Sequence, residues 1–88
     1  MAKTSRFAVW VQLGHALKEA GRRSEALLVY NEARQLKPND PDLLCNLGHL
    51  YKLMGDTQEA IACYRRSAEL DHNRHAVAEL RHLGVAPP

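Results

Sequence analysis

Apolar positions along the chain recur at the three- and four-residue spacing of amphipathic helices. The clearest run consists of Leu43, Leu44, Leu47, Leu50, Tyr51 and Met54. Such spacing gathers apolar side chains on one face of a helix. Asp40 and Pro41 precede the run as an N-cap residue and a proline at the first helical position. Gly55 follows it, and a residue without a Cβ suits the left-handed conformation at a helix end. The pattern therefore predicts a helix from Pro41 to about Met54.

A similar run follows Gly55 and predicts a second helix. Its inward-facing residues are Ala60, Ile61, Tyr64 and Ala68. Asp56, with Glu59 three residues later, forms a capping arrangement before it. The first half of the chain repeats this design on either side of Gly21, with Trp10, Leu13, Gly14 and Leu17 and then Ala26, Leu27, Tyr30 and Ala33. Each helix should be about 14 residues and about 20 Å long. The first is expected to begin without a polar N-cap.

The two halves are copies of one unit. A shift of 34 residues aligns 7–40 with 41–74, and ten of the 34 pairs are identical. The identical pairs are Leu13/Leu47, Gly14/Gly48, His15/His49, Lys18/Lys52, Gly21/Gly55, Glu25/Glu59, Ala26/Ala60, Tyr30/Tyr64, Leu36/Leu70 and Asn39/Asn73. A fixed period of this length is typical of stacked-repeat proteins, in which one unit cannot bury its own apolar face.

Small residues recur where the paired helices are expected to approach closely. Gly14 and Ala26 in the first unit correspond to Gly48 and Ala60 in the second. A larger side chain at any of these positions would push the antiparallel helices apart. We therefore interpret these residues as selected for size.

The repeat does not continue regularly after residue 74. Two interpretations remain open. In the first, a capping helix from about His75 to Leu83 packs on the second unit, before Pro87 and Pro88 stop it. Its apolar residues are Ala76, Val77, Leu80 and Leu83. In the second, this segment is the truncated start of a third repeat.

Composition restricts the class of protein. The chain has 88 residues and a formal net charge of +2, so one small domain over residues 1–88 is expected. It lacks the dense basic stripe of a nucleic-acid-binding protein and any apolar stretch of about 20 residues that could cross a membrane. Cys45 and Cys63 have neither metal-type nor redox-type spacing. We expect reduced thiols, a cytoplasmic location, and neither nucleic acid nor membrane as a partner.

No residue pattern indicates catalysis or a cofactor. The sequence has no glycine-rich phosphate loop and no nucleophile elbow, and Cys45 near His49 lacks an orienting partner. His75, Glu79 and His82 share one helix face, but a solvated polar face has the same spacing. We therefore expect no enzyme activity, no catalytic residue, no bound metal and no cofactor.

The repeated residues resemble the tetratricopeptide repeat family. The first unit reads Trp10-x2-Leu13-Gly14-x2-Leu17, Ala26-x3-Tyr30, Ala33 and Pro38, and the second reads Leu44-x2-Leu47-Gly48-x2-Tyr51 and Ala60-x3-Tyr64. The second unit departs from the pattern at Ser67 and His72. The resemblance covers 68 of 88 residues. It implies an all-α solenoid: a right-handed superhelical stack of antiparallel helix pairs, with two such units and a C-terminal capping helix.

The resemblance also implies a concave groove, lined by the first helix of each unit, that holds partner peptides. The expected groove residues are Val11, Gln12, His15, Lys18, Cys45, Asn46, His49 and Lys52. In members with a carboxylate clamp, two lysines, an arginine and two asparagines bind the acidic tails of chaperones. Only Asn46 matches one of those five places here, so chaperone-tail binding is disfavoured. Lysines and histidines still leave the groove slightly positive, which mildly favours acidic peptides.

These features support two hypotheses about function. The favoured one is a non-catalytic protein-interaction module, a scaffold or adaptor that binds a peptide or helix in the groove and can form a homo-oligomer through its ends. The alternative is a repeat segment of a larger enzyme, such as a glycosyl- or sulfo-transferase, that positions a protein substrate.

Overall fold

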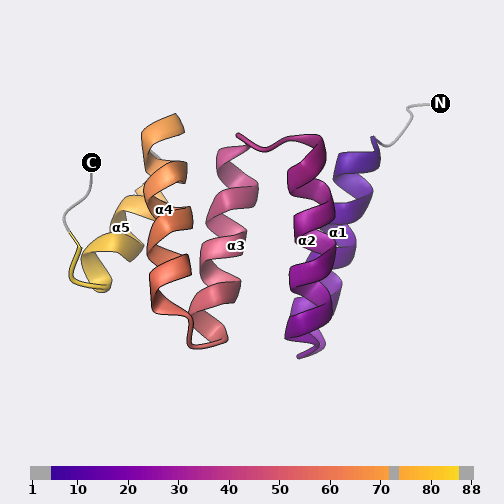
Figure 1. The fold of residues 1–88 in the computed structure, drawn as a ribbon, viewed down its shortest axis with the longest axis horizontal. Coiled ribbons are helices and arrows are strands. Elements are labelled where there is room, and N and C mark those ends of the chain that lie inside the picture. The colour runs from indigo at the N-terminus through magenta and orange to yellow at the C-terminus, as the bar shows by residue number, and fades with distance from the viewer. Residues whose placement is uncertain (1–4, 72–73, 86–88) are drawn as a thin grey trace. The chain divides into compact units, whose positions relative to one another are not determined.

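The fold is all-helical, as the apolar pattern predicts. The computed structural model describes residues 5–71 and 74–85. Within these ranges it contains five helices, α1 (Arg6–Glu19), α2 (Arg23–Leu36), α3 (Pro41–Leu53), α4 (Thr57–Asp71) and α5 (Arg74–His82). The chain divides into two compact units between Pro38 and Asn39. α1 packs with α2 in the first, and α3 packs with α4 and α4 with α5 in the second (Figure 1).

Helix ends follow the local sequence. Gly21 and Gly55 have φ angles of 78° and 83°, in the left-handed region that favours glycine, so the predicted helix ends are confirmed. The Asp40 carboxylate caps α3 by accepting a hydrogen bond from the Leu43 amide at 2.9 Å. Asp56 caps α4 in the same way, by accepting from a backbone amide at 3.3 Å.

The expectation that the first helix lacks a polar cap is wrong. Ser5 precedes α1, and its hydroxyl oxygen accepts a hydrogen bond from the Ala8 amide at 3.0 Å. The prediction missed this cap because no periodic apolar run marks Arg6 as the first helical residue.

Each helix pair approaches closely at a glycine. A Cβ atom at Gly48 would lie 2.9 Å from Cδ1 of Tyr64, and a Cβ at Gly14 would collide with the ring of Tyr30. Both tyrosine rings are fully buried. The prediction that these glycines permit close packing is therefore confirmed, and the atoms nearest each glycine belong to the tyrosine of the second helix.

The fifth helix contributes to the core of the second unit. Ala76 and Leu80 are buried in a cluster with residues of α3 and α4, and Val77 and Leu83 pack against this cluster. The α3 and α4 members are Cys45, Ala60, Tyr64 and Ala68. This confirms the packing expected of a C-terminal capping helix, which begins and ends one residue earlier than the sequence suggests.

Ser67, which departs from the family pattern, has a structural role of its own. It is fully buried on α4, and its hydroxyl donates a hydrogen bond to the Pro41 carbonyl oxygen at 2.7 Å. The bond links α4 to the first turn of α3. Ala33 holds the equivalent place in the first unit and is also fully buried.

None of the helices in the described part of the chain combines the length and the apolar composition that a membrane span requires.

Candidate functional site

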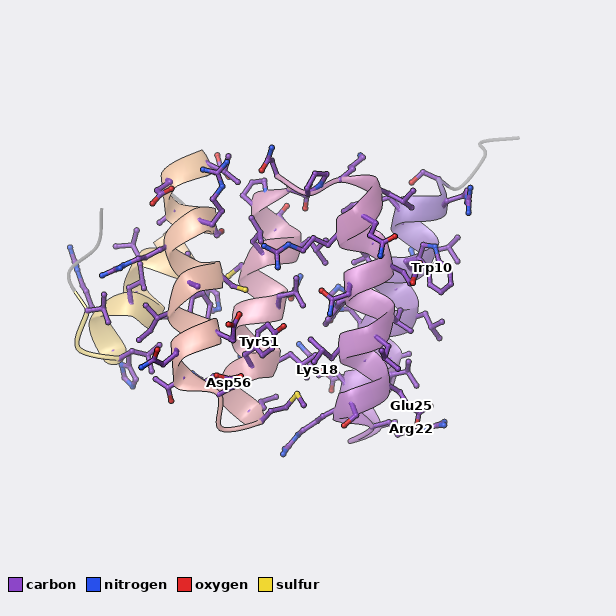
Figure 2. The ribbon with its side chains drawn as sticks, in the orientation of Figure 1. Trp10, Lys18, Arg22, Glu25, Tyr51 and Asp56 are labelled. Atoms are coloured by element: carbon purple, nitrogen blue, oxygen red, sulfur yellow. The ribbon has the colours of Figure 1, made fainter. Side chains whose placement is uncertain are left out.

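In the first unit, all of the predicted groove residues lie on α1. They are Val11, Gln12, His15 and Lys18. Their spacing places them along one helix face. Gln12 is exposed and the other three are half-buried. Lys18 belongs to the C-terminal part of α1, and Arg22 and Glu25, at the start of α2, form an ion pair of 2.6 Å (Figure 2).

His15 is oriented by a residue of the second helix. Oη of Tyr30 lies 2.6 Å from Nδ1 of His15, and the two rings meet edge to face with their centroids 5.6 Å apart. Burial, together with the nearby charge of Lys18, lowers the pKa of His15. Burial raises the pKa of Tyr30 to about 12. Both groups that form this hydrogen bond therefore favour their neutral forms at neutral pH, so His15 contributes little positive charge to this face.

In the second unit, the predicted residues Cys45, Asn46, His49 and Lys52 lie on α3. These residues differ in how far their side chains are exposed to solvent. Cys45 is buried in the cluster that includes α5, so its thiol is part of the core. Asn46 is half-buried, and its Nδ2 donates to the Asp42 carbonyl oxygen of the preceding turn at 3.0 Å. His49 is half-buried.

Lys52 is engaged by the capping helix. Its Nζ donates to Oε2 of Glu79 at 2.7 Å, which joins α3 to α5. This hydrogen bond is the largest influence on Glu79 and lowers the pKa of its carboxyl group. The ion pair is partly shielded, with side-chain exposures of 32% for Lys52 and 20% for Glu79.

The expected positive charge of the candidate site is therefore reduced. Burial and the nearby charge of Lys18 favour the neutral form of His15 by lowering its pKa, and the charge of Lys52 is compensated by Glu79. Lys18 contributes the cationic charge of the first-unit face. These surroundings weaken the expected preference for acidic peptides.

Tyr30 and Glu79 bear directly on the candidate site, although the sequence analysis did not assign them to it. Tyr30 was recognised as a core residue, but nothing in a periodic apolar pattern signals that its hydroxyl reaches His15. Glu79 lies 27 residues from Lys52, so this contact depends on how α5 packs. The only signal in the sequence for the His15–Tyr30 contact is the repeat, because both residues recur 34 residues later, as His49 and Tyr64.

The arrangement offers little for metal or nucleophilic chemistry. Glu79, which could have joined His75 and His82 as a ligand, accepts from Lys52 instead. Among residues 5–71 and 74–85, no group of three or more histidine, cysteine or acidic side chains is placed to hold a metal ion. Cys45 and Cys63 are free thiols, and both are buried.

Comparison with known families agrees with this geometry. A family model described as TPR repeat matches residues 14–55, and one described as Tetratricopeptide repeat matches residues 41–74. The chain belongs to the tetratricopeptide repeat family. Domains of this family are generally non-catalytic and bind other proteins. No curated protein sequence matches the chain.

Proposed function

We propose that this tetratricopeptide repeat chain is a single non-catalytic interaction domain, a scaffold or adaptor that binds an extended peptide or a helix of a partner protein. One observation carries the proposal. The first helix of each unit presents a side-chain amide at the same place in the repeat, Gln12 in α1 and Asn46 in α3. Amide side chains both donate and accept, as a peptide backbone requires, and this grip tolerates different ligand sequences.

The proposed site comprises the eight groove residues, in differing roles. Gln12 and Asn46 contact the backbone of the ligand, and Lys18 contacts its polar or acidic side chains. Buried or engaged residues support these contacts without touching the ligand through their polar atoms. These supporting residues are His15, which is hydrogen-bonded to Tyr30; Cys45, which is buried in the cluster that includes α5; and Lys52, which is paired with Glu79. Val11 and His49, both half-buried, complete the surface.

A peptide display library tests this proposal directly. Peptides selected on the chain are synthesised, and their affinities are measured by fluorescence polarisation. Asn46→Ala and Gln12→Ala should each weaken binding by about fivefold to tenfold, the effect of one lost hydrogen bond. Gln35→Ala removes an exposed amide from α2 and serves as the matched control. Unchanged affinity in both groove variants, with native helicity, would remove these residues from the site.

A further inference from the structure

One face of α1 is apolar and exposed. Its residues are Val9, Leu13 and Ala16 of α1 together with the C-cap residue Ala20, hereafter the α1 stripe. Their spacing aligns them along the helix over about 16 Å. Val9 is 50% exposed and Leu13 is 43% exposed. The expectation that Leu13 faces the core is therefore wrong, because the packing of α1 on α2 does not cover this side of α1.

The internal repeat shows that the α1 stripe is a packing face. Its counterparts one period later are Leu43, Leu47, Leu50 and Met54. The three leucines are buried and only Met54 is exposed. The α1 stripe therefore corresponds to a face that is largely buried in the second unit, and it fits a surface that another helix covers.

The order of side-chain sizes along the α1 stripe indicates which helix could cover it. The large residues, Val9 and Leu13, come first, and the small residues, Ala16 and Ala20, come last. If a second α1 runs antiparallel to the first, Leu13 lies opposite Ala16 and Val9 lies opposite Ala20, at both ends of the pair. Each large side chain then meets a small one, which permits close approach of the helices.

We propose that a second copy of this chain covers the α1 stripe, through an antiparallel α1–α1 pair related by a two-fold axis. This inference rests on the proposed function: if the chain is a protein-interaction domain, one of its partners is a second copy of itself. An isologous contact of this kind closes at a dimer.

Polar side chains of α5 argue against a head-to-tail arrangement of copies. The exposed residues of α5 include His75, Arg81 and His82. A head-to-tail contact would bury these polar groups against the apolar side chains of the α1 stripe, which is costly. The two-fold arrangement buries apolar side chains of α1 on both copies.

Sedimentation of the 88-residue chain over a wide range of concentrations tests the dimer. We expect a reversible monomer–dimer equilibrium. Leu13→Glu should raise the dissociation constant of the dimer by about tenfold or more, because it places a charge in an apolar contact. The matched control is Leu28→Glu, which makes the same change at a leucine of α2 that is 69% exposed and outside the α1 stripe. It should leave the equilibrium unchanged.

An exchange of residue sizes tests the register of the pair. Leu13→Ala leaves a gap and Ala16→Leu places two leucines opposite each other, so each should weaken the dimer by about tenfold. The double variant, Leu13→Ala with Ala16→Leu, again places a large residue opposite a small one and should restore the dimer. Stronger association of Ala16→Leu alone would indicate unspecific apolar contact and would overturn the proposal.

Two further results would overturn it. One is a monomer with native helicity at every concentration, which fits a stripe covered by another polypeptide. The other is a dimer that Leu13→Glu and the size exchange leave intact. Peptide binding separates this inference from the proposed function, because the α1 stripe contains none of the eight groove residues. If Leu13→Glu is monomeric and still binds the selected peptides, the groove and the dimer are independent; loss of binding in Asn46→Ala tests the groove alone.

Discussion

Tyr30 and Tyr64 occupy the same place in their repeats, yet their hydroxyl groups have different surroundings. Both rings are fully buried against a glycine of the preceding helix. The Tyr30 hydroxyl is paired with His15. The Tyr64 hydroxyl is buried and makes no hydrogen bond within the described residues. Burial of this hydroxyl raises the pKa of Tyr64. A buried polar group without a partner costs about 1–3 kcal/mol.

Removing each hydroxyl in turn should therefore have unequal effects. Tyr30→Phe loses a hydrogen bond and should lower the free energy of unfolding by about 1 kcal/mol. Tyr64→Phe removes an unpaired group and should leave that free energy unchanged or raise it by up to about 1 kcal/mol. Urea unfolding followed by circular dichroism measures both, and each variant is the matched control of the other. Equal destabilisation by the two substitutions would mean that the Tyr64 hydroxyl has a partner.

The two helical glycines provide a second test at the same scale. Gly48→Ala gains about 1 kcal/mol of helix propensity but forces the ring of Tyr64 away from α3. Because the ring is fully buried, the loss of packing should exceed the gain in helix propensity and lower the free energy of unfolding by about 1–3 kcal/mol. Gly14→Ala should cost more, because Tyr30 approaches closer and its hydroxyl is held by His15.

The reverse substitution, Ala62→Gly at an exposed position of α4, measures the propensity term alone and should cost about 1 kcal/mol. Thermal unfolding of the three variants would show the order of their stabilities. A stabilised Gly48→Ala variant would contradict the close packing of α3 and α4.

Helices and their ends could be predicted from the sequence because the signals are local. Caps such as Asp40 and turns such as Gly55 act within a few residues, and the 34-residue repeat doubles each signal. The surroundings of the candidate site could not be predicted, because they depend on contacts between helices. The burial of Cys45, like the pairing of Lys52, is decided by how α5 packs. Periodicity placed these residues on the correct helix without showing what covers them.

The attachment of α5 should depend on pH through one ion pair. The pKa of Glu79 is lowered from 4.5 by its hydrogen bond with Lys52. A carboxyl group with a lowered pKa stabilises the fold above its ordinary pKa, and this contribution is lost as the pH falls through the lower value. For a partly shielded pair we expect a contribution of about 1 kcal/mol at neutral pH.

Glu79→Gln should therefore be less stable than the unsubstituted chain at neutral pH, by about 1 kcal/mol in urea unfolding. Below the pKa of Glu79 the two proteins should become equally stable, because the carboxyl group is then neutral in both. Lys52→Gln is the control and should show the same convergence. A difference that persists in acid would attribute the effect to packing of the side chain instead of charge.

Across the described residues, the buried core is distributed unequally between the two units. Among residues 5–38 the fully buried side chains are Ala26, Tyr30 and Ala33, two of them alanines. In the second unit, leucines of α3 and residues of α4 and α5 are buried as well. Stability in repeat proteins is approximately a sum of unit and neighbour contributions. The first unit therefore has less apolar burial to oppose its local opening.

Hydrogen exchange should reveal this inequality. At low protein concentration we expect amides of α1 and α2 to exchange at least about tenfold faster than those of α3 and α4, because opening of the first unit exposes less apolar surface. Leu80→Ala, which removes a fully buried side chain of α5, should raise exchange in α4 and leave α1 unchanged. If a second copy covers the α1 stripe, protection of α1 should also rise with protein concentration, whereas Leu13→Glu should abolish that rise. Equal exchange rates in the two units would contradict this expectation. They would show that the stability of the first unit does not come from its own buried side chains alone.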